Sequence, residues 1–332
     1  MANCDIFLFA DKGDSVRIAK LIKTGVQSML RTLQIVDNKL VESSDSNSQI
    51  CVYVAPDDAE RKYLVETLKI DEHTLSSSLD PDEPSRLEFE PEHIAMIFKR
   101  PKHYAPHDEF LFKILSVGVF IFNDKIIIVL ADDIPLFDGK VFNKVTSLPE
   151  ISLKLIFRAI LHFVEHLRGI NRISNELEQQ VNVSMENKYL LNMFTLEKSL
   201  VYYLNAIHSN SVLISKLKTY SPKIGFTQDN MEFLDDISIE NNQSLAQTEI
   251  FSQVLSSMMD ARASIISNNL NIRIKALTIL TIAIMLPTFV VSLFSMNVRI
   301  PLSEHHYAFW IIAFLAFLSS AVLAMFWWRK KW

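Results

Sequence analysis

Two long runs without a charged residue, both near the C-terminus, constrain the fold of this 332-residue chain most strongly. The first run, residues 276–298, has 23 residues, and the second, residues 307–328, has 22. A helix needs about 20 apolar residues to cross the hydrocarbon core of a bilayer. Two buried helices of a soluble core are the alternative, but charge-free runs of this length favour a transmembrane hairpin.

Basic residues flank both outer ends of this hairpin. Arg273 and Lys275 precede the first run, and Arg329, Lys330 and Lys331 follow the second. Because Lys and Arg concentrate on the cytoplasmic side, the N- and C-termini are predicted to be cytoplasmic in a multi-pass protein of the plasma (inner) membrane. The net charge of −5 divides into +5 after residue 270 and −10 before it. That distribution favours a membrane and argues against a nucleic-acid partner.

The chain before the hairpin predicts an α+β membrane protein with a cytoplasmic α/β domain over residues 1–150. Apolar runs rich in β-branched and aromatic residues predict strands at residues 6–9, 50–54, 94–98, 115–122 and 125–130. The dipeptide Asn123-Asp124 predicts a tight hairpin turn between the last two strands. Three prolines within residues 79–91 predict a loop. The two cysteines, Cys4 and Cys51, form no C-x-x-C motif, which indicates a reduced, cytosolic setting.

Helical periodicity begins near residues 147–150 and predicts long stalk helices over residues 151–270. The predicted helices cover residues 152–168, 172–217 and 230–294, with breaks at Gly169 and residues 220–225. No proline lies between Pro222 and Pro287, so one helix can run from about residue 245 into the first span. The predicted membrane region then comprises span 271–298, outer loop 299–306, span 307–328 and a basic tail at residues 329–332.

A polar stripe follows this helix in steps of three and four residues. Eleven of its thirteen members are polar: Gln253, Ser257, Asp260, Ser264, Ser267, Asn271, Ile274, Thr278, Thr281, Met285, Thr288, Ser292 and Ser295. When parallel helices of an oligomer wind together, residues spaced in this way face the common axis. Because this face is polar, the axis is predicted to be filled with water. Ser and Thr hydroxyls that bond their own backbone, or that join neighbouring helices, are the alternative interpretation.

At these residues the chain resembles the CorA family of divalent-cation channels. The matching pattern is Met259-Asp260, Asn271, Leu277-Thr278, Thr288-Phe289 and Ser295-Met296-Asn297, followed by a short loop, a second span and a basic end. The resemblance implies a homopentamer with a funnel-shaped cytoplasmic domain and the first span lining the pore. It also implies that no prosthetic group is needed, and that Mg²⁺ or a related divalent ion is the cargo and a regulatory ligand.

The resemblance assigns roles residue by residue. Ser295, Met296 and Asn297 would form the selectivity motif, with Asn297 meeting the hydrated ion at the outer end. Asp260 would be the interface acid that binds regulatory metal. The pore lining would comprise Asn271, Ile274, Leu277, Thr278, Thr281, Met285, Thr288 and Ser292. Of these, Ile274 and Leu277 would close the pore by excluding water.

Three departures from the family pattern bear on these roles. The hallmark glycine of the selectivity motif is Ser295 here, although serine resists positive φ. The outer loop carries Arg299, Glu304, His305 and His306, where the family's loop is acidic. The acids that would partner Asp260 align with Ser76 and Ser77, unless Asp80 or Asp82 substitutes for them.

Other candidate sites are weaker. His162 and His166 share a helical face as a metal pair would, but solvated helix residues are the favoured interpretation. Asp235-Asp236 fits a minor cation site or an acid pair at a helix N-terminus. The sequence contains no nucleotide-binding glycine loop and no nucleophile motif, so no enzyme is predicted.

The sequence leaves three functions open. The first is a homo-oligomeric channel or transporter for Mg²⁺, Co²⁺, Ni²⁺ or Zn²⁺, with the lipid bilayer and further copies of the chain as partners and the membrane potential as driving force. The second is a proton-coupled zinc transporter on the same scaffold, suggested by the imidazoles of His305 and His306. The third is a non-conducting sensor or scaffold, suggested by Ser295 and Arg299.

Overall fold

The computed structural model describes residues 29–43, 48–104, 110–183, 187–296 and 306–330. The chain divides into two compact units, Met1–Leu255 and Ser256–Trp332, which are described separately. The strand predicted at residues 6–9, and Cys4, lie outside the described residues.

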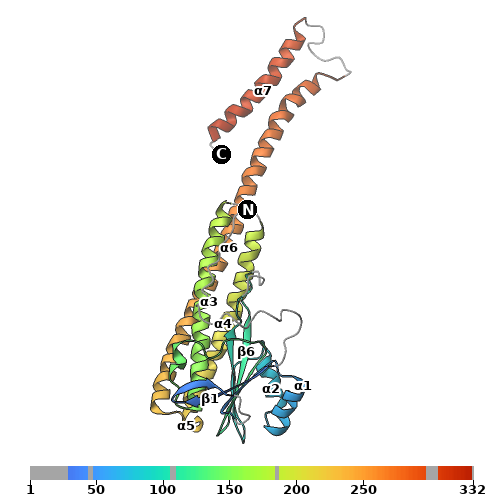
Figure 1. Cartoon of the computed structure of the whole chain (residues 1–332). Helices are drawn as coiled ribbons and strands as arrows, with labels where there is room; N and C mark the ends of the chain where they lie inside the picture. The colour runs from blue at the N-terminus through green and yellow to red at the C-terminus, as the bar shows by residue number, and fades with distance from the viewer. Residues whose placement is uncertain (1–28, 44–47, 105–109, 184–186, 297–305, 331–332) are drawn as a thin grey trace, which may run out of the picture. The chain divides into compact units, whose positions relative to one another are not determined.

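The first unit is built on a seven-stranded sheet with the order β2-β1-β3-β7-β6-β5-β4 (Figure 1). Neighbouring strands are antiparallel except for β3 and β7, which are parallel. The strands are β1 (Met29–Val36), β2 (Lys39–Glu42), β3 (Ile50–Val54), β4 (Arg86–Phe89), β5 (Ile94–Pro101), β6 (Ile114–Ile121) and β7 (Ile126–Leu130).

Helices cover both faces of this sheet (Figure 1). One face carries α1 (Asp58–Lys62), a π-helical segment (Tyr63–Thr67) and α2 (Glu72–Leu79). The other carries a short 3₁₀ helix (Lys140–Asn143), α3 (Leu148–Val183), α4 (Asn187–Thr219), α5 (Ser221–Ile224) and the first turns of α6 (Gln228–Leu293).

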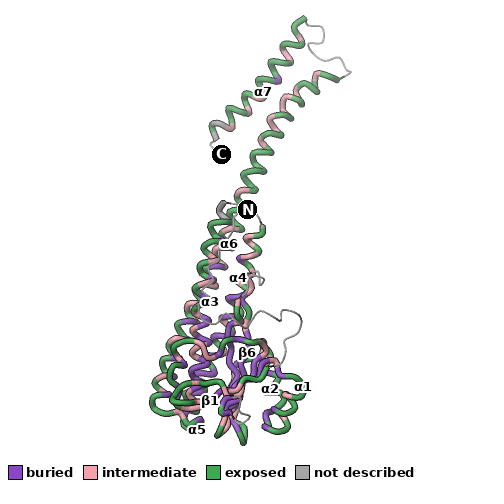
Figure 2. The backbone as a smooth tube through the Cα atoms, viewed as in Figure 1, coloured by how far each residue is buried: buried purple, intermediate pink, exposed green. Residues whose placement is uncertain are grey.

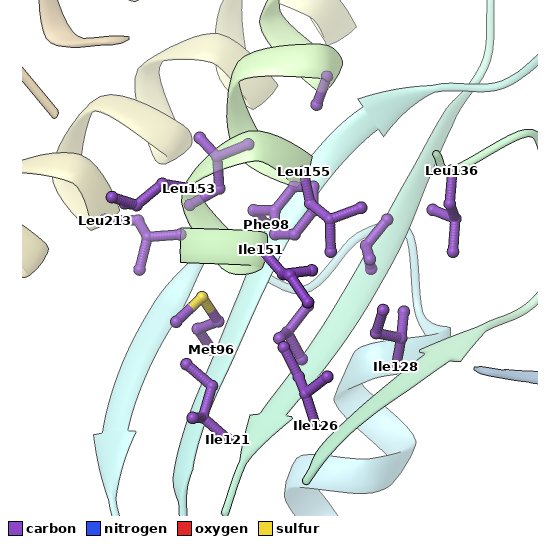
Figure 3. Packing of buried hydrophobic residues seen from close by; sticks show 14 of the residues in the cluster. Met96, Phe98, Ile121, Ile126, Ile128, Leu136, Ile151, Leu153, Leu155 and Leu213 are labelled. Carbon is purple, nitrogen blue, oxygen red and sulfur yellow. The ribbon is translucent and has the colours of Figure 1, made fainter. Parts of the chain in front are cut away.

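Successive side chains of each central strand point to opposite faces of the sheet, and each face has its own hydrophobic core. In β7, Ile126, Ile128 and Leu130 belong to the core shared with α3, α4 and α6. The alternating Ile127 and Val129 belong to the core shared with α2. Because helices cover both faces of the sheet, these strands are apolar at every position and do not alternate between apolar and polar residues. Figure 3 shows the first core, where Ile151 and Leu155 of α3 lie beside Phe98, Ile126 and Ile128 of the sheet.

Most of the predicted elements are confirmed. Strands occur at the four described positions that the sequence predicts, and the hairpin turn at Asn123-Asp124 closes with the Phe122 amide donating to the Lys125 carbonyl at 2.8 Å. Glu150 caps the start of α3 by accepting the amide and the hydroxyl of Thr146. Gly225, with a φ of 83°, ends α5 in the predicted break.

Three predictions about local structure are wrong or incomplete. Residues 79–91 are not all loop, because β4 pairs there with β5. Gly169 does not break a helix: α3 continues through it to Val183. Strands β1 and β2 were not predicted, although Asp37 and Asn38 between them adopt the positive φ values of 49° and 61° that a tight hairpin requires.

Close approach of α2 to β6 requires a glycine in the sheet. A Cβ atom built on Gly118 would lie 2.3 Å from the Cβ of Ser78 in α2. Real Cβ atoms do not approach that closely, so any side chain at residue 118 would push α2 away from the sheet.

The second unit contains the rest of α6 and helix α7 (Ala308–Lys330). Both helices are long and apolar enough to span a membrane, with mean hydropathy of 2.3 and 2.4 over their most apolar 18 residues. Of these windows, 0% of the residues in α6 and 6% of those in α7 are buried, and Figure 2 shows the exposed residues along both helices. The predicted architecture of α/β domain, long helices and apolar C-terminal helix pair is confirmed.

Candidate ion pathway on helix α6

All the residues predicted to line a pore lie on α6, and all are exposed in the single chain. They are Asn271, Ile274, Leu277, Thr278, Thr281, Met285, Thr288 and Ser292. Two of the apolar members are among the more exposed large hydrophobic residues of the described part: Leu277 is 65% exposed and Met285 is 66% exposed. Further copies of the chain are therefore needed if this face is to be enclosed.

The opening between α6 and α7 lies on another side of α6. It is lined by Leu286, Val290 and Leu293 of α6 and by residues of α7 that include Leu315 and Val322. None of the pore-lining candidates is among the described residues that line this opening. The polar stripe is thus separate from the surface that faces the second span.

The threonine hydroxyls of the stripe share one geometry. Each donates to the backbone carbonyl four residues earlier: Thr278 to Ile274 at 2.9 Å, Thr281 to Leu277 at 2.9 Å and Thr288 to Ile284 at 2.7 Å. A hydroxyl has one hydrogen to donate and two lone pairs that accept. With the hydrogen used on the helix, each oxygen presents only acceptor capacity outward. These hydroxyls thus bond their own backbone, and their oxygens remain able to accept hydrogen bonds from positively polarised partners.

Pro287 adds a further acceptor that the sequence analysis did not consider. Proline has no amide hydrogen, so within α6 the carbonyl of Ala283 receives no backbone hydrogen bond from residue 287. Such freed carbonyls are tolerated in membrane helices when another group satisfies them. The presence of a proline within a predicted helix was the sequence signal that could have identified this additional acceptor.

The outer end of α6 is described only as far as Met296. The helix ends at Leu293, and the amide and hydroxyl of Ser295 both donate to the carbonyl of Ser292. Asn297, Arg299, Glu304 and His305 lie outside the described residues. His306 is exposed, with its ring against Tyr307.

The acids of the predicted regulatory site are exposed where they are described. Asp260 is exposed on α6. Ser77 is buried, and its carbonyl accepts the amide of Asp80 at the end of α2, whereas Ser76 is exposed on α2. Asp80 and Asp82 are both exposed in the following loop, and are the acids available there. Within the described residues, no group of three or more His, Cys, Asp or Glu side chains is arranged to hold a metal ion.

His162 is buried and His166 is half-buried, which corrects the favoured interpretation of both as solvated helix residues. His162 is buried and its ring centroid lies 4.3 Å from that of His166. Arg100 donates to Nδ1 of His162 at 3.5 Å, and the Tyr203 hydroxyl lies 2.6 Å from Nδ1 of His166. Burial and neighbouring cationic groups lower the pKa of His162 to about 2 and that of His166 to about 4.

Asp235 is also explained by a local partner. Its carboxylate forms an ion pair with Lys218 of α4. Because α6 begins at Gln228, Asp235 lies beyond the first turn and is not an acid of the helix N-terminus. The pair therefore joins α4 to α6 and offers little for a cation site.

Comparisons of the sequence with protein families and with known proteins agree with each other. The family model described as CorA-like Mg²⁺ transporter protein matches residues 49–331. The cobalt/magnesium transport protein CorA of Methanocaldococcus jannaschii is 24% identical over 289 residues, covering 83% of this chain and 89% of that protein.

Solved structures share the fold along nearly the whole chain. The complete structure of the CorA magnesium transporter from Methanocaldococcus jannaschii superposes with a TM-score of 0.75 at 21% identity, covering 93% of this chain and all of that one. The full-length CmaX protein has a TM-score of 0.70 at 15% identity, with the same coverage. Because the family model matches most of the sequence, the chain belongs to the family of CorA-like Mg²⁺ transporter proteins.

Proposed function

We propose that the chain forms a homopentameric channel that moves Mg²⁺, and related ions such as Co²⁺, Ni²⁺ or Zn²⁺, across the plasma (inner) membrane. The polar stripe of α6 lines the pore in this proposal. Residues 1–270 form the cytoplasmic part, and both termini lie in the cytoplasm. The M. jannaschii relative is a cobalt/magnesium transport protein, which supports the same class of cargo.

The acceptor-only hydroxyls of α6 carry this proposal. Mg²⁺ gives up its water shell reluctantly, so a pore must bind the hydrated ion. Waters bound to a cation point their hydrogens outward, and those hydrogens need acceptors. Thr278, Thr281 and Thr288 offer oxygens whose own hydrogens are already used on the helix. Five copies would give successive rings that favour hydrated cations and offer nothing to anions.

Two further features complete the pathway. Ile274 and Leu277 form an apolar ring near the basic cytoplasmic flank, where exclusion of water closes the pore. Asn297 forms the outer ring, whose neutral amide oxygens bind the hydrated ion more weakly than five carboxylates would. The membrane potential drives entry with about 2.3 kcal/mol per charge per 100 mV, and thus about twice that for a divalent ion.

Ion flux into proteoliposomes tests the proposal. Purified full chain is reconstituted around a Mg²⁺-sensitive dye, and a K⁺ gradient with valinomycin sets the potential. The expected result is Mg²⁺ entry that grows with inside-negative potential, with Co²⁺, Ni²⁺ and Zn²⁺ offered in parallel. The same vesicles with a pH gradient and no potential provide the second condition.

The possible outcomes distinguish the functions that the sequence left open. Zn²⁺ entry that requires the pH gradient and ignores the potential would replace the channel with a proton-coupled zinc transporter. Absence of flux for all four ions, in vesicles that contain folded oligomer, would leave the sensor or scaffold. Asn297→Ala should change the ion preference of a channel but should change nothing in a non-conducting protein.

A further inference from the structure

One face of the β1–β2 hairpin carries apolar residues that the described helices leave half exposed. Side chains of β1 alternate between the two faces of the sheet, and Leu33 points into the core shared with α3. Leu30 and Val36 lie on the opposite face, together with Val41 of β2, whose partner on that face is Gln34. We call Leu30, Val36 and Val41, all about half exposed, the open face.

The helix layer on this side of the sheet ends between β3 and β1. Leu30 pairs with Tyr53 of β3, and both side chains point to the side of the sheet that carries α2. Tyr53 is 6% exposed, whereas Leu30 is 49% exposed. Helix α2 itself lies against β5, β6 and β7. An apolar surface beside such a layer can be buried by one more helix.

The segment that precedes β1 has the sequence of a short amphipathic helix. Residues 1–28 lie outside the described residues, and within them Asp14-Ser15 and Gly25 are the start and stop signals for a helix over residues 16–24. Three of its apolar residues recur three and four positions apart: Ile18, Leu21 and Ile22. Its polar residues fall on the other side: Arg17, Lys20, Lys23 and Thr24. Such a helix has one apolar side to bury.

A helix this short needs a surface to pack against. Isolated helices of fewer than about 12–15 residues are only marginally stable in water. The strand predicted at residues 6–9 precedes the helix and β1 follows it, which is the order of a βαβ unit. The helix of a βαβ unit packs on a face of the sheet. We therefore expect residues 16–24 to lie on the sheet that contains β1.

The link to β1 limits which surface this helix can reach. Residues 25–28 span at most about 14 Å, so the end of the helix stays near the start of β1. On one side of β1, Leu33 is already buried in the core shared with α3. On the other side, the open face extends about 20 Å from Leu30 to Val36. A helix over residues 16–24 is about 14 Å long and covers most of that distance.

We propose that residues 16–24 form a helix whose apolar side covers the open face of the β1–β2 hairpin. The occupant of this surface is therefore a segment of the same chain. A basic amphipathic helix could also bind an anionic membrane surface, but the four-residue link holds this one beside the sheet. The proposal concerns the first unit alone and does not depend on ion transport.

Disulfide cross-linking in the full chain tests this contact. With Cys4 and Cys51 replaced by alanine, Ile18→Cys and Gln34→Cys place thiols on the apolar side of the helix and on the face of β1 that it should cover. Arg17→Cys with Gln34→Cys is the matched control, because residue 17 lies on the polar side. A disulfide needs Cβ atoms about 4 Å apart, so oxidation should link the first pair and leave the control pair unlinked.

Linked tryptic peptides from the monomer band of a non-reducing gel measure the yield of each pair. Equal yields in the two pairs, or no link in the first, would overturn the proposal. A link found only in a dimer band would place the segment of a neighbouring copy on the open face, and would also overturn it.

Hydrogen exchange in nanodiscs of neutral lipid provides a second test. Leu21→Gln and Lys20→Gln introduce the same residue on the apolar and on the polar side of the helix. Amides of residues 16–24 should exchange at least about tenfold faster in Leu21→Gln than in the parent, because a buried leucine is lost. Lys20→Gln should exchange like the parent. Equal exchange in the two variants would refute the docked helix, and protection that requires anionic lipid would assign the segment to the membrane surface instead.

Discussion

At the scale of single residues, the hydroxyls of the α6 stripe are the most direct test of the ion pathway. Thr281→Val keeps the shape of the side chain and leaves the backbone hydrogen bonds of the helix in place, but it removes one acceptor per copy. We expect Mg²⁺ flux into proteoliposomes to fall by at least about tenfold, since a lost hydrogen bond to a charged partner is equivalent to roughly 1.5–3 kcal/mol.

The matched control for this change is on the other span. Ser319 of α7 also donates its hydroxyl to its own helix, at the Ala316 carbonyl. Ser319→Ala should leave the flux unchanged. Equal losses in both variants would mean that the hydroxyls support helix packing rather than conduction.

The pair of His162 and His166 predicts a pH dependence of stability. An unfolded chain protonates histidine near pH 6.5, whereas folded His166 resists protonation until its pKa of about 4. Between these values the unfolded state binds more protons, so the free energy of unfolding decreases as the pH falls. For His166 the loss is on the order of 2–3 kcal/mol by pH 4.

Substitution at His166 should flatten this dependence. His166→Gln removes the titrating group and keeps an acceptor for the Tyr203 hydroxyl. Urea unfolding followed by far-UV circular dichroism between pH 7 and pH 4 measures the slope. The control is His208→Gln, which changes an exposed histidine of α4 and should keep the parent slope. An unchanged slope in His166→Gln would show that other groups cause the acid sensitivity.

At the scale of elements, two glycines provide opposite predictions. Gly118→Ala should destabilise the first unit by about 1–3 kcal/mol, because its Cβ would overlap that of Ser78. Gly169→Ala should stabilise it by about 0.5–1 kcal/mol, because Gly169 lies within α3 and a Cβ there meets nothing within 4 Å. Chemical denaturation of both variants checks the signs. A neutral Gly118→Ala would mean that α2 can move away from β6 without cost.

The elements that the sequence predicted correctly carry strong local signals. The β6–β7 hairpin combines two apolar runs with a two-residue turn, and α6 has a long uninterrupted periodicity. Strand β4 was missed because Arg86 and Glu88 alternate with Leu87 and Phe89 among prolines, and only pairing with β5 makes that pattern a strand. The burial of His162 depends on α4 and β5, which are distant in sequence and could not be placed from periodicity.

At the scale of the whole molecule, the sequence predicted the family, and the family model confirms it. Membership also confirms that the chain is an ion transporter rather than an enzyme. The enclosure of the pore could not be derived from one chain, because every pore-lining candidate on α6 is exposed there. Only the arrangement of several copies decides which residues face a common axis.

Cross-linking between copies tests that arrangement. With Cys4 and Cys51 replaced by alanine, Ser292→Cys should form disulfide-linked dimers on oxidation in nanodiscs, whereas Val291→Cys on the adjacent face should not. Native mass spectrometry should find five copies of the 38.1 kDa chain, about 190 kDa. Equal cross-linking at both positions, or a different mass, would be inconsistent with a pentamer lined by the stripe.

The parallel pairing of β3 with β7 has a consequence for how the first unit folds. The antiparallel strands β5, β6 and β7 are close in sequence, so their contacts form with little loss of chain entropy. Ile50 of β3 pairs with Ile126 of β7, across a much longer stretch of chain. Non-local pairings of this kind slow folding. The centre of the finished sheet should therefore be the last pair of strands to join, and its refolding rate should limit that of the whole unit.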